Sequence, residues 1–279
     1  MKLTKNVKVG QRARDIILII FAIMFMSPLY WMLMLSVKSS TQAAGAPWAI
    51  PNELHFENYI DAWQRIEVPH LLKNSFIYTA GSMAICLLCC TMVAYALTRM
   101  RMKYSRPATL YFTIGMLIPA SVLMIPVYRL VMSLGIKGTP WALILPYAAF
   151  SMSSATLMMA AFFRSLPVEM EEAAAIDGCG VYRSFFSIML PLVKPAIATQ
   201  ALLMFINNWN EYGLASILAI GKEMRPIPLA LELFFGQFDL TNWGVVGAAV
   251  TITSLPIMAV YFICNKQIEQ AMTGASGLK

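Results

Sequence analysis

The sequence predicts an all-α membrane protein, a bundle of six transmembrane helices, from three observations. Of its 279 residues, 59% are hydrophobic and 13% are charged, whereas soluble domains carry about 25% charged residues. Six apolar blocks are each long enough to cross a bilayer, which takes about 20 residues. Lys and Arg also concentrate beside these blocks on one side of the membrane, which explains the net charge of +7 without a nucleic-acid partner.

The predicted spans follow one another at 15–37, 75–98, 108–131, 141–163, 195–220 and 244–264. The first is expected to be a retained helix, because it is too long for a cleaved signal peptide and no small-residue cleavage site follows it. Of the 21 Lys and Arg residues, fourteen fall on the side of the N-terminal tail 1–14 and the C-terminal tail 265–279. The excess of cations predicts a multi-pass protein of the cytoplasmic membrane with both termini in the cytoplasm.

The longest external segment is 38–74, which follows the first predicted span. It is acidic in its middle and carries aromatic side chains at Phe56, Tyr59 and Trp63. Aromatic residues collect at the headgroup level of a bilayer, so an interfacial helix explains them. A lip that meets an external partner explains them as well, and the sequence leaves both readings open.

The charged connection 164–194 is predicted to form two short helices joined by a turn. Pro167 and the glutamates after it suit the first turn of a helix, and the alanines that follow let a partner backbone approach closely. Gly178 supplies the positive φ that ends a helix. A second helix is expected over 181–189, and Pro191 is expected to end it because the residue before a proline is pushed out of helical geometry.

The fifth predicted span carries a polar cluster midway along its length, made of Asn207, Asn208, Asn210 and Glu211 with Trp209. An ionisable group near the bilayer centre costs about 2.5–3.5 kcal/mol on insertion scales, so a functional role is the default interpretation. Amide groups and an aromatic platform suit a sugar pathway, and Asn207 and Glu211 are expected to share one helix face. The alternative is that these side chains bridge helices as polar contacts between spans.

Several function classes find no support in the residues. The sequence contains no Gly-x-x-x-x-Gly-Lys-Ser/Thr phosphate loop, so this chain is not expected to hydrolyse ATP by that route. It offers no catalytic triad and no metal-binding cluster, and its five cysteines imply no disulfide framework. No catalytic residue, metal site or bound cofactor is therefore predicted.

Residues 172–191 contain Glu-Ala-Ala, three residues, Gly, nine residues, Ile, one residue and Leu-Pro. This pattern resembles the cytoplasmic loop, called the EAA loop, by which membrane subunits of binding-protein-dependent ABC importers dock onto their ATPase. The positions that carry the resemblance, and the coupling role it implies, are Glu172, Ala173, Ala174, Asp177, Gly178, Ile188, Leu190 and Pro191.

The resemblance extends over nearly the whole chain, and it is strongest to the permeases of carbohydrate importers, the branch with the six-helix second permease of the maltose transporter. It rests on Asn58-Tyr59 with Trp63, on Ile118-Pro119 and Ile125-Pro126, on Phe162 to Pro167, and on Trp209 to Tyr212. It implies a single permease domain over 1–279 with the type I ABC importer fold.

The same resemblance implies a transport component rather than an enzyme. The expected partners are a homologous permease subunit in a heterodimer, two ATPase subunits that bind Mg-ATP, and an extracytoplasmic solute-binding protein. The expected cargo is a sugar or oligosaccharide. The resemblance leaves open whether this chain or the partner permease contacts it. A self-sufficient secondary transporter or channel is the alternative, and it would need no docking loop.

Overall fold

The computed structural model describes residues 2–65, 67–100, 102–234 and 242–276, and it describes side chains over 14–65, 67–100, 102–230 and 242–264. Every regular element among these residues is a helix. The chain separates into two compact units, one made of Met1–Val68 with Leu231–Leu255 and the other of Pro69–Ala230 with Pro256–Lys279. The predicted all-α membrane bundle is confirmed at the level of fold class.

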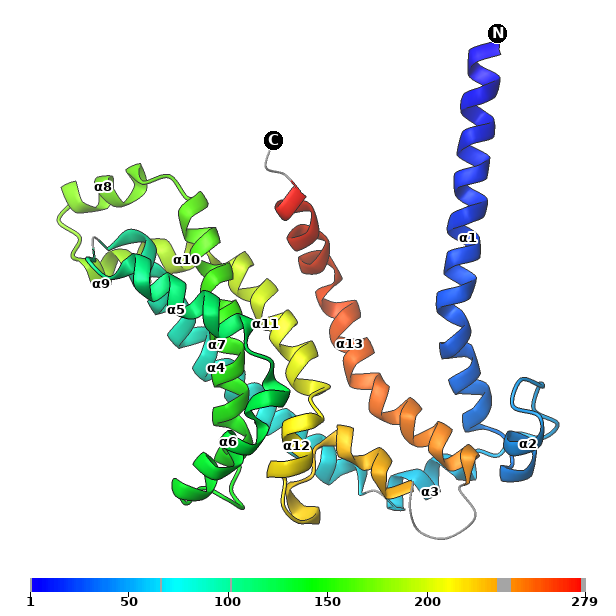
Figure 1. The fold of residues 1–279 in the computed structure, drawn as a ribbon. Coiled ribbons are helices and arrows are strands. Elements are labelled where there is room, and N and C mark those ends of the chain that lie inside the picture. The colour runs from blue at the N-terminus through cyan, green and yellow to red at the C-terminus, as the bar shows by residue number, and fades with distance from the viewer. Residues whose placement is uncertain (1, 66, 101, 235–241, 277–279) are drawn as a thin grey trace. The chain divides into compact units, whose positions relative to one another are not determined.

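The first unit contains the long helix α1 (Lys2–Ser36), the short helices α2 (Ser40–Gly45) and α3 (Glu57–Arg65), and the start of α13 (Trp243–Ser276) (Figure 1). The Asn58 side chain donates to the main-chain oxygens of Ser36 and Lys38 at 3.0 and 2.9 Å, which fixes α3 against the end of α1. Gly247 lies against the same turn, where a Cβ atom would come within 2.8 Å of the Ser36 nitrogen. Helix α13 therefore begins in close backbone contact with the end of α1.

The second unit is built around α4 (Val68–Arg99) and α7 (Trp141–Ser165), against which α5 (Ser105–Leu117), α6 (Ala120–Ser133), α11 (Lys194–Trp209) and α12 (Gly213–Leu218) pack. Helices α5 and α7 come together at Gly115, where an added Cβ would lie 2.6 Å from the Ser153 hydroxyl. The segment after α12 contains η2 (Lys222–Met224) and η3 (Ile227–Phe234). Side chains at the start of α4 bind it, since Asn74 and Tyr78 donate to carbonyls of residues 223–225.

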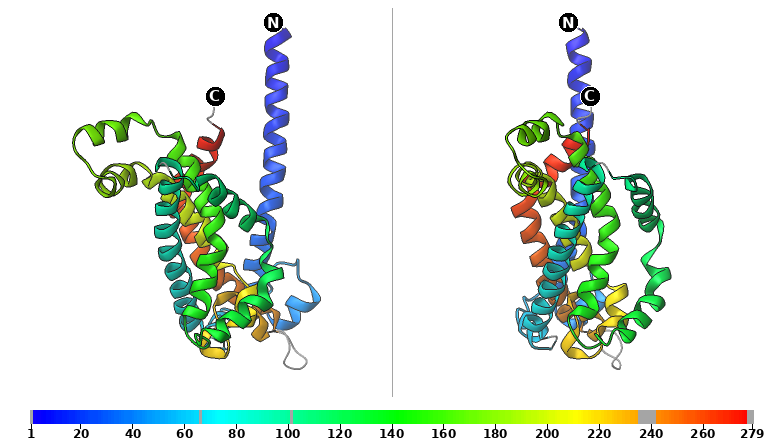
Figure 2. Two further views of the ribbon diagram at one scale, coloured as in Figure 1. Left: turned by 60° about the vertical axis from the view of Figure 1, so that its left-hand side comes forward. Right: turned by 90° about the vertical axis from the view of Figure 1, so that its left-hand side faces the viewer.

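The third predicted span, 108–131, is wrong as a single straight helix. The structure breaks it into α5 and α6, which meet at an angle of 101° (Figure 2). Ile118 has the extended torsions φ −83° and ψ 117°, in keeping with the preference of a residue before proline, here Pro119, for extended over helical torsions.

The fifth predicted span, 195–220, is also interrupted. Helix α11 ends at Trp209, and α12 begins at Gly213 after a short non-helical connection. Among the described residues, four helices are long and apolar enough to cross a membrane by themselves. The number rises to six if each of two bent pairs, α5 with α6 and residues 181–192 with α11, is one span. The spans at 75–98, 141–163 and 244–264 each lie within one long helix, as predicted, and the span at 15–37 matches α1 except for its last residue.

Candidate functional site

The connection 164–194 folds as a helical hairpin, as the sequence predicts. Helix α8 (Glu169–Ile176) is followed by a turn and by α9 (Val181–Ser184), which continues into the π-helical turn η1 (Phe185–Met189) and α10 (Leu190–Leu192). Gly178 has φ +77°, and the Cys179 amide donates to the Ala174 carbonyl at 2.9 Å, which is the Schellman arrangement for ending a helix. Figures 1 and 2 show this hairpin extending beyond the end of α7.

The continuation through Pro191 corrects one expectation. Leu190 keeps helical torsions, φ −61° and ψ −43°, so the helix does not end before the proline. The π turn explains this, because the Leu190 amide bonds to the Phe185 carbonyl one residue further back than in an α-helix. The wider turn makes room for the proline ring, and π turns are one recognised way for a helix to absorb such a disturbance.

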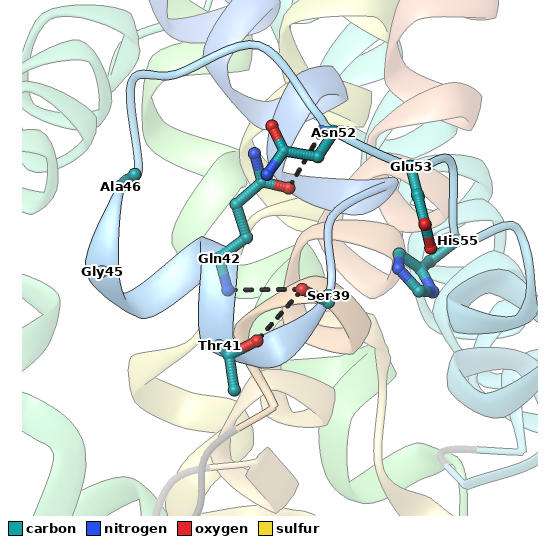
Figure 3. Close-up of a pocket in the computed structure, with 8 residues that line it drawn as sticks. All are labelled: Ser39, Thr41, Gln42, Gly45, Ala46, Asn52, Glu53 and His55. Atoms are coloured by element: carbon teal, nitrogen blue, oxygen red, sulfur yellow. Dashed lines mark hydrogen bonds between the residues drawn. The ribbon is translucent and has the colours of Figure 1, made fainter.

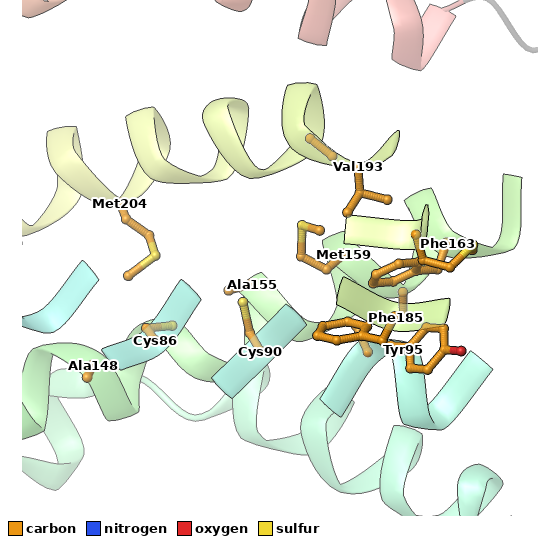
Figure 4. Close-up of a cluster of buried hydrophobic side chains, with 14 residues drawn as sticks. Cys86, Cys90, Tyr95, Ala148, Ala155, Met159, Phe163, Phe185, Val193 and Met204 are labelled. Carbon is orange, nitrogen blue, oxygen red and sulfur yellow. The ribbon is translucent and has the colours of Figure 1, made fainter. Parts of the chain in front are cut away.

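The inner side of the hairpin is anchored in the core of the second unit. Phe185 and Met189 are buried in a cluster with Tyr95 of α4 and with Met159 and Phe163 of α7 (Figure 4). The rings of Tyr95 and Phe185 lie 4.9 Å apart, and those of Tyr95 and Phe163 lie 5.7 Å apart. The second half of the hairpin is therefore held by packing against two spanning helices.

The outer side of the hairpin carries large apolar side chains in full exposure. Ile176 is 86% exposed and Tyr182 is 81% exposed, one on each side of the turn. Glu172, Ala173, Asp177 and Pro191 are exposed as well, and Ile188 and Leu190 are half-buried. Sequence reasoning missed Ile176 and Tyr182, although two apolar residues flanking a glycine turn in a charged loop are a signal that the sequence contains.

Ala174 differs from its neighbours, because it is only 4% exposed. Its side chain is buried within this chain, so a partner protein cannot reach it in this conformation. The expectation that Ala174 forms part of the contacting surface is therefore wrong for this structure. Ala173 and Ile176 occupy the exposed side of the same helix.

The polar cluster of the fifth span divides into two groups. Asn208 is only 8% exposed; its amide donates to the Ser82 hydroxyl of α4 at 2.9 Å and accepts from the Ser151 hydroxyl of α7 at 3.5 Å. Trp209 is buried too. Neither side chain faces open space in this structure, which argues against a place for them in a pathway. Asn208 instead bridges three helices, which was the alternative interpretation.

Glu211 has a local role that the sequence reasoning did not foresee. Its carboxylate oxygens accept the amides of Leu214 and Ala215 at 2.7 and 3.0 Å, which satisfies the first free N–H groups of α12. Glu211 lies outside α11. The expectation that it shares a helix face with Asn207 is therefore wrong. Asn207 and Asn210 are exposed and remain available to a pathway.

The segment between α1 and α3 holds a polar pocket of about 480 Å³ lined by residues of 39–55 (Figure 3). Its polar groups mostly bind the loop itself: the Gln42 amide donates to the Ile50 carbonyl at 2.9 Å and accepts from the Asn52 amide at 3.2 Å. Lys38 is fully buried and donates to the carbonyls of Ala46 and Pro47; burial lowers the pKa of its ammonium group. A hydrogen bond from His55 lowers the pKa of the Glu57 carboxyl.

In the part of the chain that the structure describes, no three His, Cys, Asp or Glu side chains come close enough together to hold a metal ion. The five cysteines are free thiols.

Three comparisons place this geometry among known proteins. The sequence profile of the family described as "Binding-protein-dependent transport system inner membrane component" matches residues 87–274. The chain is 31% identical over 268 residues to a probable ABC transporter permease protein, YurM, of Bacillus subtilis, covering 96% of this chain and 89% of the relative.

Two further similarities concern proteins with named cargo. A sulfoquinovosyl glycerol transport system permease protein of Agrobacterium fabrum, SmoH, is 31% identical over 97% of this chain and 94% of its own length. A solved chain from a bacterial ABC transporter involved in the import of the acidic polysaccharide alginate matches with a TM-score of 0.80 at 25% identity. That match covers 93% of this chain and 96% of the solved one.

Proposed function

The chain belongs to the family of binding-protein-dependent transport system inner membrane components, and from this membership we propose that the hairpin 164–194 is the surface that receives the ATPase. The chain is a multi-pass membrane permease of an ABC importer for a sugar or oligosaccharide, a transport component that works with an ATPase and a solute-binding protein. Membership of this family stands against the alternative of a self-sufficient secondary transporter.

The observation that supports docking is the contrast between the two sides of the hairpin. Phe185 and Met189 fix its inner side to α4 and α7, whereas Ile176 and Tyr182 are exposed at its tip. Apolar side chains clustered at an exposed tip mark an interaction surface, and a rigid anchor lets that surface transmit force. Together with the EAA pattern of 172–191, this arrangement suits a groove on a partner that moves.

The wider assembly follows as part of the same proposal. Two hairpins, one from this chain and one from a homologous permease, would each receive one of two ATPase subunits, and those subunits would bind Mg-ATP and hydrolyse it. The hairpin then lies in the cytoplasm, which agrees with the cation excess that predicts cytoplasmic termini. Asn207 and Asn210 are the remaining candidates for side chains that line the translocation pathway.

Docking is tested by Ile176→Asp, which places a charge on the exposed tip without disturbing the core. We expect co-purification of the ATPase, and its stimulation by loaded binding protein, to fall by about tenfold, as for an interface side chain that contributes more than 1 kcal/mol. Ile50→Asp is the matched control, because Ile50 is a 75% exposed isoleucine outside both the hairpin and the predicted spans.

Gly178→Val tests the shape of the same surface. A β-branched residue at φ +77° adds about 1–3 kcal/mol of strain to the turn, so the ATPase should bind less well at unchanged membrane insertion. Normal ATPase recruitment by both Ile176→Asp and Gly178→Val, at wild-type protein levels, would show that the hairpin is not the docking surface.

A further inference from the structure

The side chain of Arg99, at the end of α4, contacts both the hairpin and the end of α7. Arg99 is the last residue of α4, and its side chain is 5% exposed. Its guanidinium donates to the carbonyl of Phe163 and, at 2.6 Å, to that of Leu166, both at the C-terminal end of α7. Carbonyls at a helix end lack partners within the helix and favour a nearby cation. Arg99 therefore joins the cytoplasmic ends of α4 and α7.

The other terminal nitrogen of Arg99 faces the first helix of the hairpin. It lies 3.6 Å from a carboxylate oxygen of Glu171 on α8, a largely buried ion pair. That separation is too long for a hydrogen bond. The Arg99 Nε atom and the second carboxylate oxygen of Glu171 are also buried without a hydrogen-bond partner. The pair thus has an unused donor and an unused acceptor, so a tighter, bidentate arrangement is open to it.

Tyr95, one turn earlier on α4, makes the corresponding link to the second half of the hairpin. Its ring packs on Phe163 and Phe185, as Figure 4 shows, and its hydroxyl lies near the side chains of Glu171 and Ser184. A single turn of α4 therefore contacts α7, α8 and α9. Hydrophobic packing holds the second half of the hairpin, whereas a loose ion pair holds the first.

We propose that Arg99 is a positioning residue that couples movement of α8 at the ATPase to movement of α4 and α7. The proposal rests on the proposed docking role of the hairpin and adds the element that transmits the movement into the membrane. While Arg99 keeps its two carbonyl contacts, the Glu171 contact tightens or opens as α8 shifts. Arg99 does not touch the ATPase, so its loss should impair coupling and leave docking in place.

The test uses the complete importer with its partner permease, ATPase and binding protein. Arg99→Met removes the guanidinium and keeps an unbranched apolar stem, and Glu171→Gln removes only the negative charge. We expect both variants to retain the ATPase at wild-type stoichiometry and to lose about tenfold in solute carried per ATP hydrolysed, a coupling change of ordinary size. Arg99→Lys keeps the charge without the forked geometry, and it should fall between wild type and Arg99→Met.

A merely structural role would give a different result. If Arg99 only stabilises the fold, the amount of assembled complex falls, while solute carried per ATP stays at the wild-type value; that outcome overturns the proposal. If Arg99→Met does not assemble, Glu171→Gln decides by the same ratio, because an amide replaces a carboxylate of nearly equal size.

Failure of this inference can be told apart from failure of the docking proposal. If Ile176→Asp removes the ATPase while Arg99→Met and Glu171→Gln transport with wild-type stoichiometry per ATP, docking stands and the role of Arg99 is refuted. If both Ile176→Asp and Gly178→Val leave ATPase binding intact, the docking proposal fails, and the coupling role of Arg99 fails with it.

Discussion

Replacing Asn208 by leucine should weaken the bundle and should not block a pathway by itself. The change removes the hydrogen bonds to Ser82 and Ser151, at 2.9 and 3.5 Å. Contacts of this kind between membrane helices contribute about 0.6 kcal/mol on average and about 1.7 kcal/mol at most. Ser82 keeps its own bond to the Thr79 carbonyl, so the total loss should be about 1–2 kcal/mol.

In a chain of this size a loss of that order lowers the melting temperature by about 2–8 °C. The measurement is the fraction of importer complex that survives heating in detergent, followed by size-exclusion chromatography. Asn207→Leu is the matched control, because Asn207 neighbours Asn208 but is exposed. It should leave the melting temperature unchanged and, if Asn207 lines the pathway, should reduce transport instead.

Thiol labelling distinguishes a buried Asn208 from one that lines the pathway. In a background without the five native cysteines, Asn207→Cys and Asn210→Cys should react with a water-soluble thiol reagent when the pathway is open. Asn208→Cys should stay unreactive with and without nucleotide. Reaction at 208 as fast as at 207, together with an unchanged melting temperature for Asn208→Leu, would return Asn208 to the pathway.

Three further predictions concern single contacts. Glu211→Ala should destabilise the complex by about 0.5–2 kcal/mol because α12 loses its cap, whereas Glu211→Gln keeps an acceptor and should cost less in the same melting assay; equal losses would contradict the capping role. Gly247→Val should destabilise by about 1–3 kcal/mol through overpacking, and Gly45→Val, where nothing lies within 4 Å, should not; equal melting temperatures would count against the close contact. In the fold, His55 lowers the pKa of Glu57. The contribution of the His55–Glu57 pair to stability should therefore be present at pH 6 and lost as the pH falls below about 4, the ordinary pKa of a free glutamate. The melting-temperature difference between wild type and Glu57→Gln should shrink over that range, and a difference independent of pH would refute the role of this pair.

The amino-acid sequence alone was enough to predict the class of the protein and the family to which it belongs. Hydropathy and cation placement predict the spans because insertion depends on composition summed over about 20 residues, and such a sum needs no knowledge of neighbours. The turn of the hairpin was equally accessible, since only the local torsion at Gly178 decides it. The break at Ile118 and Pro119 also has a local cause. Hydropathy averaged over a window of residues does not reveal it, because the average carries no information on the direction of the chain.

Only the tertiary structure separated neighbouring residues with similar chemistry. Asn207 and Asn208 are adjacent on one helix and point in different directions. Only Asn208 is buried, and it is Asn208 that hydrogen-bonds to Ser82 and Ser151. Ala174 and Ile176 likewise divide between the inner and outer sides of α8. Arg99 counted in the sequence as one cation among many, whereas in the fold it binds the end of α7 and faces α8. Each of these roles depends on residues distant in the chain, and only packing brings those residues together.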